Sequence, residues 1–191
     1  MGEGFTLGKN IYYLPGHGGQ IATGLGEALT ERGWSVEGRE TRDDFRKMPF
    51  GQQVDTVAGD LLHKHWHPES CVIAVSFGAY LFLHAQAQLP EFIGRVLLLS
   101  PIVGEFDSAE LQMGFIPPRA KKLFELASAG KYPVPNQCEI HVGSEDWQSN
   151  PENVTQLGQL LNIPVHVVSN NGHMLDKSYV SALLDRWLPQ H

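Results

Sequence analysis

The run from Cys71 to Tyr80 constrains the fold more than any other segment, because it passes from a strand to a helix through one residue. Cys71–Val75 is a continuous apolar, largely β-branched run, which is typical of a parallel strand covered on both faces. Ser76 follows, and a helical pattern begins directly after it. So tight a reversal forces the corner residue into a sparsely populated backbone conformation and demands small neighbours, which Gly78 and Ala79 supply.

The residues around Ser76 form a variant of a known catalytic pattern. Ala74 and Gly78 stand two residues either side of Ser76, so the run reads A-x-S-x-G where a nucleophile elbow usually reads G-x-S-x-G. Such a corner lifts the serine oxygen clear of the sheet and places it at the positive end of a helix. The alternative interpretation is an ordinary strand-to-helix connection in which Ser76 only caps the helix.

Apolar runs of strand length alternate with helical patterns along the chain, which predicts an α/β fold: a doubly wound, mostly parallel sheet of about six strands with helices on both faces. The expected strands are Ile11–Leu14, Ser35–Gly38, Cys71–Val75, Arg95–Ser100, Glu139–Val142 and Val165–Val168. The expected helices are Ile21–Arg32, Gln52–His65, Phe77–Gln88, Pro118–Ala129, Asn153–Leu161 and Lys177–Leu188. The length favours a single domain over residues 1–191.

One interval, residues 101–137, is longer than a crossover between parallel strands requires. One interpretation is a crossover helix with extra loop that docks on the sheet. The other is a small lid whose Met113, Phe115 and Ile116 line a substrate groove.

Composition excludes several classes of partner. The formal net charge is −7 and no basic stripe is present, so we expect no nucleic-acid partner. No apolar stretch is long enough to span a membrane. The two cysteines, Cys71 and Cys138, lie in apolar strand patterns and are expected to be buried free thiols. Without a disulfide framework or a signal-peptide core, the expected compartment is the cytoplasm.

Two further residues with catalytic chemistry follow predicted strands. A serine hydroxyl is a poor nucleophile at neutral pH unless a base accepts its proton and a third group orients that base. His173 follows the last predicted strand, and Asp146 follows the strand before it. The carboxyl ends of parallel strands share one edge of a sheet, which is where open α/β sheets place their sites.

These features resemble the α/β-hydrolase superfamily, particularly its small serine hydrolases with little or no cap. Three signals carry the resemblance: the elbow at Ser76, a strand followed by G-S-E-D ending at Asp146, and a strand followed by G-H ending at His173. Their order of serine, acid and histidine is the order that the superfamily uses. The resemblance implies Ser76 as nucleophile, His173 as general base and then acid, and Asp146 as the group that orients the imidazole.

A glycine-rich turn, Pro15-Gly16-His17-Gly18-Gly19, follows the first predicted strand. In the superfamily this turn donates one backbone N–H to an oxyanion hole, and the residue after the serine donates the other. The resemblance therefore implies the N–H groups of His17 and Phe77. A second alignment of the turn gives Gly19 in place of His17.

Other polar residues offer rival sites. His63 and His67 stand four residues apart, but no carboxylate or cysteine accompanies them, so we expect no metal site there. Glu145 and Asp107 are alternatives to Asp146 as the acid. Three further histidines receive structural interpretations: His141 and His166 as hydrogen-bonded core residues, and His84 as a helix-surface residue.

The resemblance implies a serine hydrolase that cleaves a small carboxylic ester or thioester through an acyl-enzyme, with no cofactor or metal. Amide, lactone and carbon–carbon hydrolases use the same three groups and remain alternatives. A third hypothesis is a binding protein that keeps the fold and turns over slowly or not at all, motivated by the short chain and the Ala74 departure. The sequence leaves the oligomeric state open.

Overall fold

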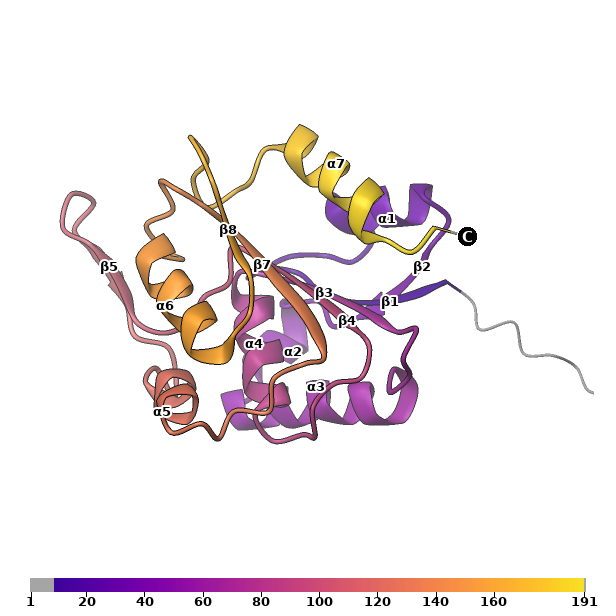
Figure 1. Cartoon of the computed structure of the whole chain (residues 1–191), viewed down its shortest axis with the longest axis horizontal. Helices are drawn as coiled ribbons and strands as arrows, with labels where there is room; N and C mark the ends of the chain where they lie inside the picture. The colour runs from indigo at the N-terminus through magenta and orange to yellow at the C-terminus, as the bar shows by residue number, and fades with distance from the viewer. Residues whose placement is uncertain (1–8, 191) are drawn as a thin grey trace, which may run out of the picture.

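A six-stranded sheet forms the centre of the computed structural model, which describes residues 9–190 (Figure 1). Its strands are β1 (Asn10–Leu14), β2 (Ser35–Gly38), β3 (Cys71–Val75), β4 (Arg95–Leu99), β7 (Gln137–Gly143) and β8 (Val165–Val168). They lie in the order β2-β1-β3-β4-β7-β8, and every neighbouring pair is parallel. The predicted doubly wound α/β fold is confirmed, and each predicted strand lies within two residues of its observed bounds.

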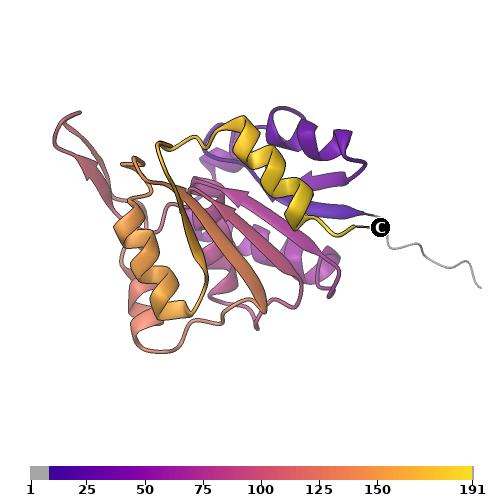
Figure 2. The same ribbon diagram turned by 45° about the horizontal axis from the view of Figure 1, so that its top comes forward.

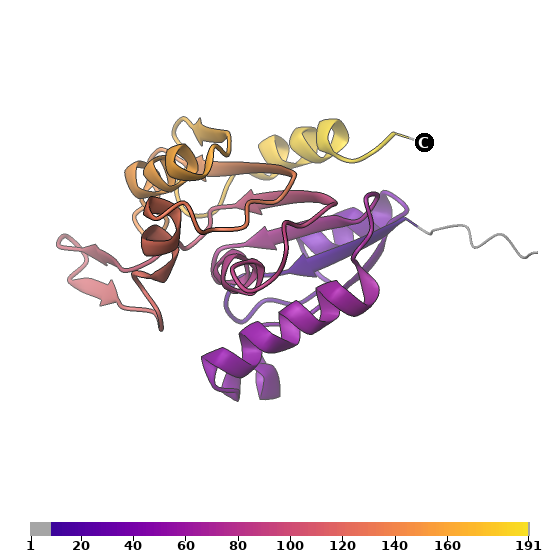
Figure 3. The ribbon, with the colours of Figure 1, turned by 60° about the horizontal axis from the view of Figure 1, so that its bottom comes forward.

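Helices cover both faces of this sheet. One face carries α1 (Leu25–Glu31) and α7 (Lys177–Trp187). The other carries α3 (Phe50–Lys64), α4 (Phe77–Gln86), α5 (Lys122–Ser128) and α6 (Pro151–Leu161). Figure 3 shows α7 and α3 on opposite sides of the strands.

The apolar strands fold this way because side chains alternate between the two faces of a strand. On β1, Ile11 packs against the α1 and α7 face, whereas Tyr12 packs against the opposite face. On β3, Ile73 packs on the α1 and α7 face and Val72 on the opposite face, and both are fully buried. A strand with two buried faces must be apolar at every position, which explains the uninterrupted run that ends at Val75.

Two elements escape the sequence patterns. A short helix, α2 (Asp43–Lys47), precedes α3. Residues 101–137 hold an antiparallel hairpin, β5 (Phe106–Ser108) and β6 (Met113–Phe115), ahead of α5. The observed crossover helix, α5 (Lys122–Ser128), is shorter than the predicted helix Pro118–Ala129. Figure 2 shows the hairpin extending away from the sheet. Strands of three residues are too short to give a periodic signal.

Helix α3 ends at Lys64, so His67 lies beyond it and does not pair with His63 on one helix. Two structural expectations for individual residues need correction. His166 is exposed rather than in the core, because β8 is an edge strand of the sheet. Both cysteines are free, but only Cys71 is buried, and Cys138 is half-buried.

Within residues 9–190, no helix is long and apolar enough to cross a membrane.

Helix α4 approaches the end of β1 very closely, and Gly78 makes this approach possible. A Cβ atom at Gly78 would lie 2.2 Å from the carbonyl oxygen of Leu14 and 2.4 Å from that of Pro15. Both obstacles are backbone atoms, so a side-chain rotation cannot relieve the clash. Glycine is therefore required at position 78, two residues after Ser76.

We predict that Gly78→Ala lowers the free energy of unfolding by about 1–3 kcal/mol, because the added methyl group forces α4 away from β1. Gly59→Ala is the matched control, since Gly59 lies within α3 and a Cβ there meets no atom within 4 Å. The control should stabilise the protein by roughly 0.5–1 kcal/mol through its helix propensity. Urea denaturation measures both, and equal stability of the two variants would contradict the close-approach argument.

Candidate active site

Ser76 occupies a strained corner between β3 and α4. Its φ is 53° and its ψ is −118°, a conformation that residues with a side chain rarely adopt. Such strain costs on the order of 1–3 kcal/mol and persists only where surrounding structure holds it. Here the Ser76 N–H donates to the carbonyl of Leu99, and the Ser76 carbonyl accepts from Tyr80 and Ile102. The corner geometry expected from the A-x-S-x-G run is present.

The structure brings Ser76, His173 and Asp146 into one hydrogen-bonded line. The Ser76 Oγ lies 2.8 Å from His173 Nε2. The His173 Nδ1 lies 3.0 Å and 2.9 Å from the two carboxylate oxygens of Asp146. A carboxylate only accepts, so Nδ1 carries the proton, and Nε2 is free to accept the proton of the serine hydroxyl. The geometry suits a serine activated by an oriented base.

Asp146 is held as a hydrogen-bond acceptor next to the histidine. Its side chain is buried, with 2% exposure of the residue. One carboxylate oxygen accepts from the backbone N–H groups of Gln148, at 3.0 Å, and Ser149, at 2.8 Å. A buried carboxyl group needs such partners, because leaving its oxygens without donors costs the full desolvation penalty. These bonds also fix the direction in which Asp146 faces His173.

The alternative acids lie elsewhere. Glu145 directly precedes Asp146, but its side chain is exposed. Asp107 lies on the hairpin strand β5 and is also exposed. Among residues 9–190, Asp146 supplies the carboxylate that bonds to His173.

The glycine-rich turn passes directly beside Ser76. A Cβ atom at Gly16 would lie 3.3 Å from the Cβ of Ser76. The Gly18 N–H donates to the carbonyl of Thr41 at 2.8 Å, and the Gly19 N–H donates to the carbonyl of Gly16 at 2.9 Å. Gly19, the alternative oxyanion donor, therefore has its N–H occupied.

The N–H groups of His17 and Phe77 behave differently. Neither donates to an acceptor within the described part of the chain. Their side chains touch, with ring centroids 5.7 Å apart and an edge-to-face angle of 88°. Phe77 begins α4 directly after Ser76, so its N–H lies at the positive end of that helix.

Thr41, which the sequence analysis did not single out, secures the glycine-rich turn. It is 2% exposed, and its hydroxyl donates to the carbonyl oxygen of Gly16. The same carbonyl accepts from Gly19, so two donors fix its direction. Carbonyl and N–H point in opposite directions across a trans peptide. The bonds to Gly16 therefore also fix the direction of the His17 N–H.

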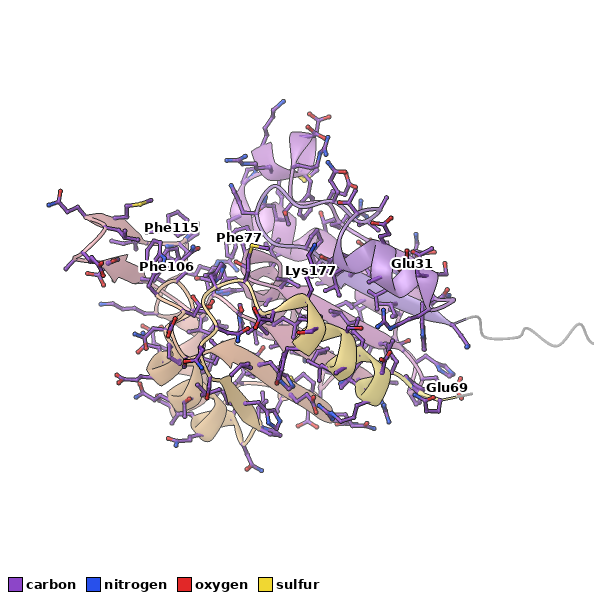
Figure 4. All side chains as sticks on the ribbon, turned by 90° about the horizontal axis from the view of Figure 1, so that it is seen from above. Glu31, Glu69, Phe77, Phe106, Phe115 and Lys177 are labelled. Carbon is purple, nitrogen blue, oxygen red and sulfur yellow. The ribbon has the colours of Figure 1, made fainter. Side chains whose placement is uncertain are left out.

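The residues expected to contact substrate lie on the hairpin strand β6 or directly after it. Met113, Phe115 and Ile116 are 59%, 45% and 68% exposed. Figure 4 shows Phe106 and Phe115 close together on the hairpin. Their ring centroids lie 5.6 Å apart. Phe106 in turn contacts Trp147, the neighbour of Asp146, at 5.7 Å. This contact joins the base of the hairpin to the segment that carries Asp146.

Met174 was missed by the sequence analysis. It follows His173 directly and is 84% exposed. Its place directly after the candidate base is the signal that could have found it.

His84 is buried, although the sequence predicts it on the exposed surface of a helix. It is 2% exposed, because α4 is enclosed by the sheet and by α3. Its ring contacts Tyr80 at 4.4 Å and Phe50 at 5.3 Å. Burial, with a further effect of Arg119 and Lys122, lowers the pKa of His84 to about 4. The ring is therefore neutral at pH 7.

Comparison by sequence gives no matching protein-family profile and no similar curated protein. Comparison of structures gives many matches. Carboxylesterase CesB (YbfK) from Bacillus subtilis has a TM-score of 0.68 and 12% identity, covering 96% of this chain and 84% of that one. Naproxen esterase (carboxylesterase NP) from B. subtilis has a TM-score of 0.67 and 14% identity, covering 96% and 85%. The B. subtilis ydeN gene product has a TM-score of 0.64 and 13% identity, covering 93% and 97%.

We predict that His84 makes the protein less stable in acid. The unfolded histidine titrates near pH 6.5 and the folded one near 4, so the unfolded state binds more protons between these values. Stability contributed by neutral His84 is full above pH 6.5 and is lost as the pH falls to 4, by up to about 3 kcal/mol. Denaturation of wild type and His84→Leu at pH 7 and 4.5 isolates this loss. The prediction is wrong if both proteins lose the same stability.

Proposed function

We propose that this chain, which has the α/β-hydrolase fold, is a serine hydrolase that cleaves a small carboxylic ester or thioester through an acyl-enzyme. The observation that carries the proposal is the line of hydrogen bonds from Ser76 through His173 to Asp146. Two solved structures with this fold, both named carboxylesterases, support the choice of an ester-type bond.

In the proposed first step, Ser76 Oγ attacks the carbonyl carbon of the substrate while His173 Nε2 takes the hydroxyl proton. Asp146 stabilises the imidazolium that forms. His173 then gives the proton to the departing alcohol or thiol, which leaves an acyl group on Ser76. Water attacks this acyl group in the second step, with His173 again as base, and releases the acid.

Negative charge develops on the carbonyl oxygen in both steps. We assign its stabilisation to the backbone N–H groups of His17 and Phe77, which have no acceptor in residues 9–190 and flank Ser76. Donors aimed in advance cost no reorganisation during the reaction. The engaged N–H of Gly19 favours His17 over the alternative alignment.

We assign substrate contact to three exposed apolar side chains, Met113 and Phe115 on the hairpin strand β6 and Ile116 directly after it. Met174 adds a fourth such side chain next to the base. Exposed apolar side chains that gather on a surface indicate that the surface binds an apolar partner. These residues would receive the acyl or alcohol part of the ester.

We predict that Ser76→Ala lowers kcat for a p-nitrophenyl short-chain ester by about 10⁴–10⁶-fold, because the three side chains act as a unit. Asp146→Asn should also cause a large loss, since it removes the group that fixes the tautomer of His173. Glu145→Gln is the matched control and should keep wild-type activity. Steady-state rates and labelling by a fluorophosphonate test all four proteins, and a Ser76→Ala variant that still labels would reject the proposal.

We also predict that Thr41→Val lowers kcat by roughly 10- to 100-fold with little change in KM, because the Gly16 carbonyl loses a donor and the His17 N–H is misaimed. Thr41→Ser keeps the hydroxyl and should retain most of the activity. A purely structural role of Thr41 would instead lower stability and leave kcat per folded molecule unchanged. Rates normalised to titrated active sites, with thermal melting of each variant, separate the two roles.

A further inference from the structure

We propose that Glu139, His141 and His166 form a binding site for a divalent transition-metal ion such as Zn²⁺. One ligand atom from each residue lies within 4.8 Å of the other two. Among residues 9–190, no other group of three histidine, cysteine or acidic side chains comes this close. Two imidazoles and a carboxylate form a donor set typical of zinc sites with an open position.

The sheet itself brings the three residues together. His141 on β7 and His166 on β8 are direct partners in the parallel register. Glu139 precedes His141 by two residues, so both side chains point to the same face of β7. Their contacts with Tyr179 and Arg186 of α7 place the cluster on the α7 side of the sheet.

Glu139 and His141 are the two less exposed members of the cluster. His141 is 2% exposed and Glu139 is half-buried. They would bind a metal as a neutral imidazole and an ionised carboxylate.

Outer partners for these two ligands are already in place. The His141 Nε2 lies 2.9 Å from Glu139 Oε1, and its Nδ1 lies 2.6 Å from the Tyr179 hydroxyl. A metal at Nε2 would replace the proton now shared with Glu139. The single ring proton then resides on Nδ1 and is donated to the Tyr179 oxygen. Metal-bound histidines are usually oriented by such a bond from their second nitrogen.

Two side chains, those of His166 and Arg186, must move before the cluster can bind an ion. The rings of His141 and His166 stack at 4.5 Å with an angle of 16°, so the exposed His166 ring must turn for both nitrogens to face one ion. Arg186 lies 2.7 Å from Glu139 Oε1 with a side chain 58% exposed, and it competes with a cation for this carboxylate. The exposed edge strand β8 gives the ion a path from solvent.

The test is calorimetric titration of the untagged, chelator-treated protein with Zn²⁺ at pH 7.5. Wild type should bind one equivalent and melt at a higher temperature with Zn²⁺ present. His166→Ala and Glu139→Gln should weaken binding at least tenfold, whereas His63→Ala, an exposed histidine outside the cluster, should not. Because His166 is exposed, its variant should melt like wild type without metal.

Arg186→Gln should change the Zn²⁺ affinity in the opposite direction. If the cluster binds metal, removing the competing cation should tighten Zn²⁺ binding by roughly tenfold. If the cluster is only a hydrogen-bonded network, no variant changes Zn²⁺ binding and the proposal is overturned. Saturable binding that survives in His166→Ala overturns it equally. Ser76→Ala should bind Zn²⁺ normally, so the result is independent of the proposed hydrolase activity.

Discussion

The corner at Ser76 depends on how closely three pieces of backbone approach one another. Gly78 lets α4 contact the end of β1, and Gly16 lets the glycine-rich turn pass beside the serine. The same corner requires a strained backbone at Ser76, which has a positive φ. Backbone hydrogen bonds from Ser76 to neighbouring segments hold this conformation in place. The corner fixes the serine oxygen, and the candidate base His173 lies within hydrogen-bonding distance of it with Asp146 behind.

Parallel pairing turns long sequence separations into contacts. His173 lies 97 residues from Ser76 and 27 from Asp146, yet hydrogen bonds join them, because β3, β7 and β8 end at one edge of the sheet. Within the same two strands, before their carboxyl ends, the parallel register of β7 and β8 pairs His141 with His166. One sheet therefore carries two polar constellations: one at the strand ends, where loops can shape a site, and one on a strand face that α7 crosses.

Buried polar groups beside the candidate site help to hold its loops. The Thr41 hydroxyl bonds to the Gly16 carbonyl, and the Asn171 side chain exchanges hydrogen bonds with Asp176 in the loop that carries His173. His84 lacks a partner for its Nε2 and stays neutral within an aromatic cluster that reaches Phe77. Contacts between loops therefore help to position the candidate site, in addition to the pairing of the strands.

The sequence by itself determined the six parallel strands, the corner at Ser76 and the places of Asp146 and His173, because two-residue alternation, buried runs and glycine or proline stops are local signals. Tertiary structure alone decided what depends on neighbours distant in the chain. The burial of His84 requires α3 to cover α4, and the engaged N–H of Gly19 requires the folded turn. The hairpin of residues 106–115 was missed because its strands are too short for a period, and the cluster of His141 with His166 follows from strand order, which no local pattern encodes.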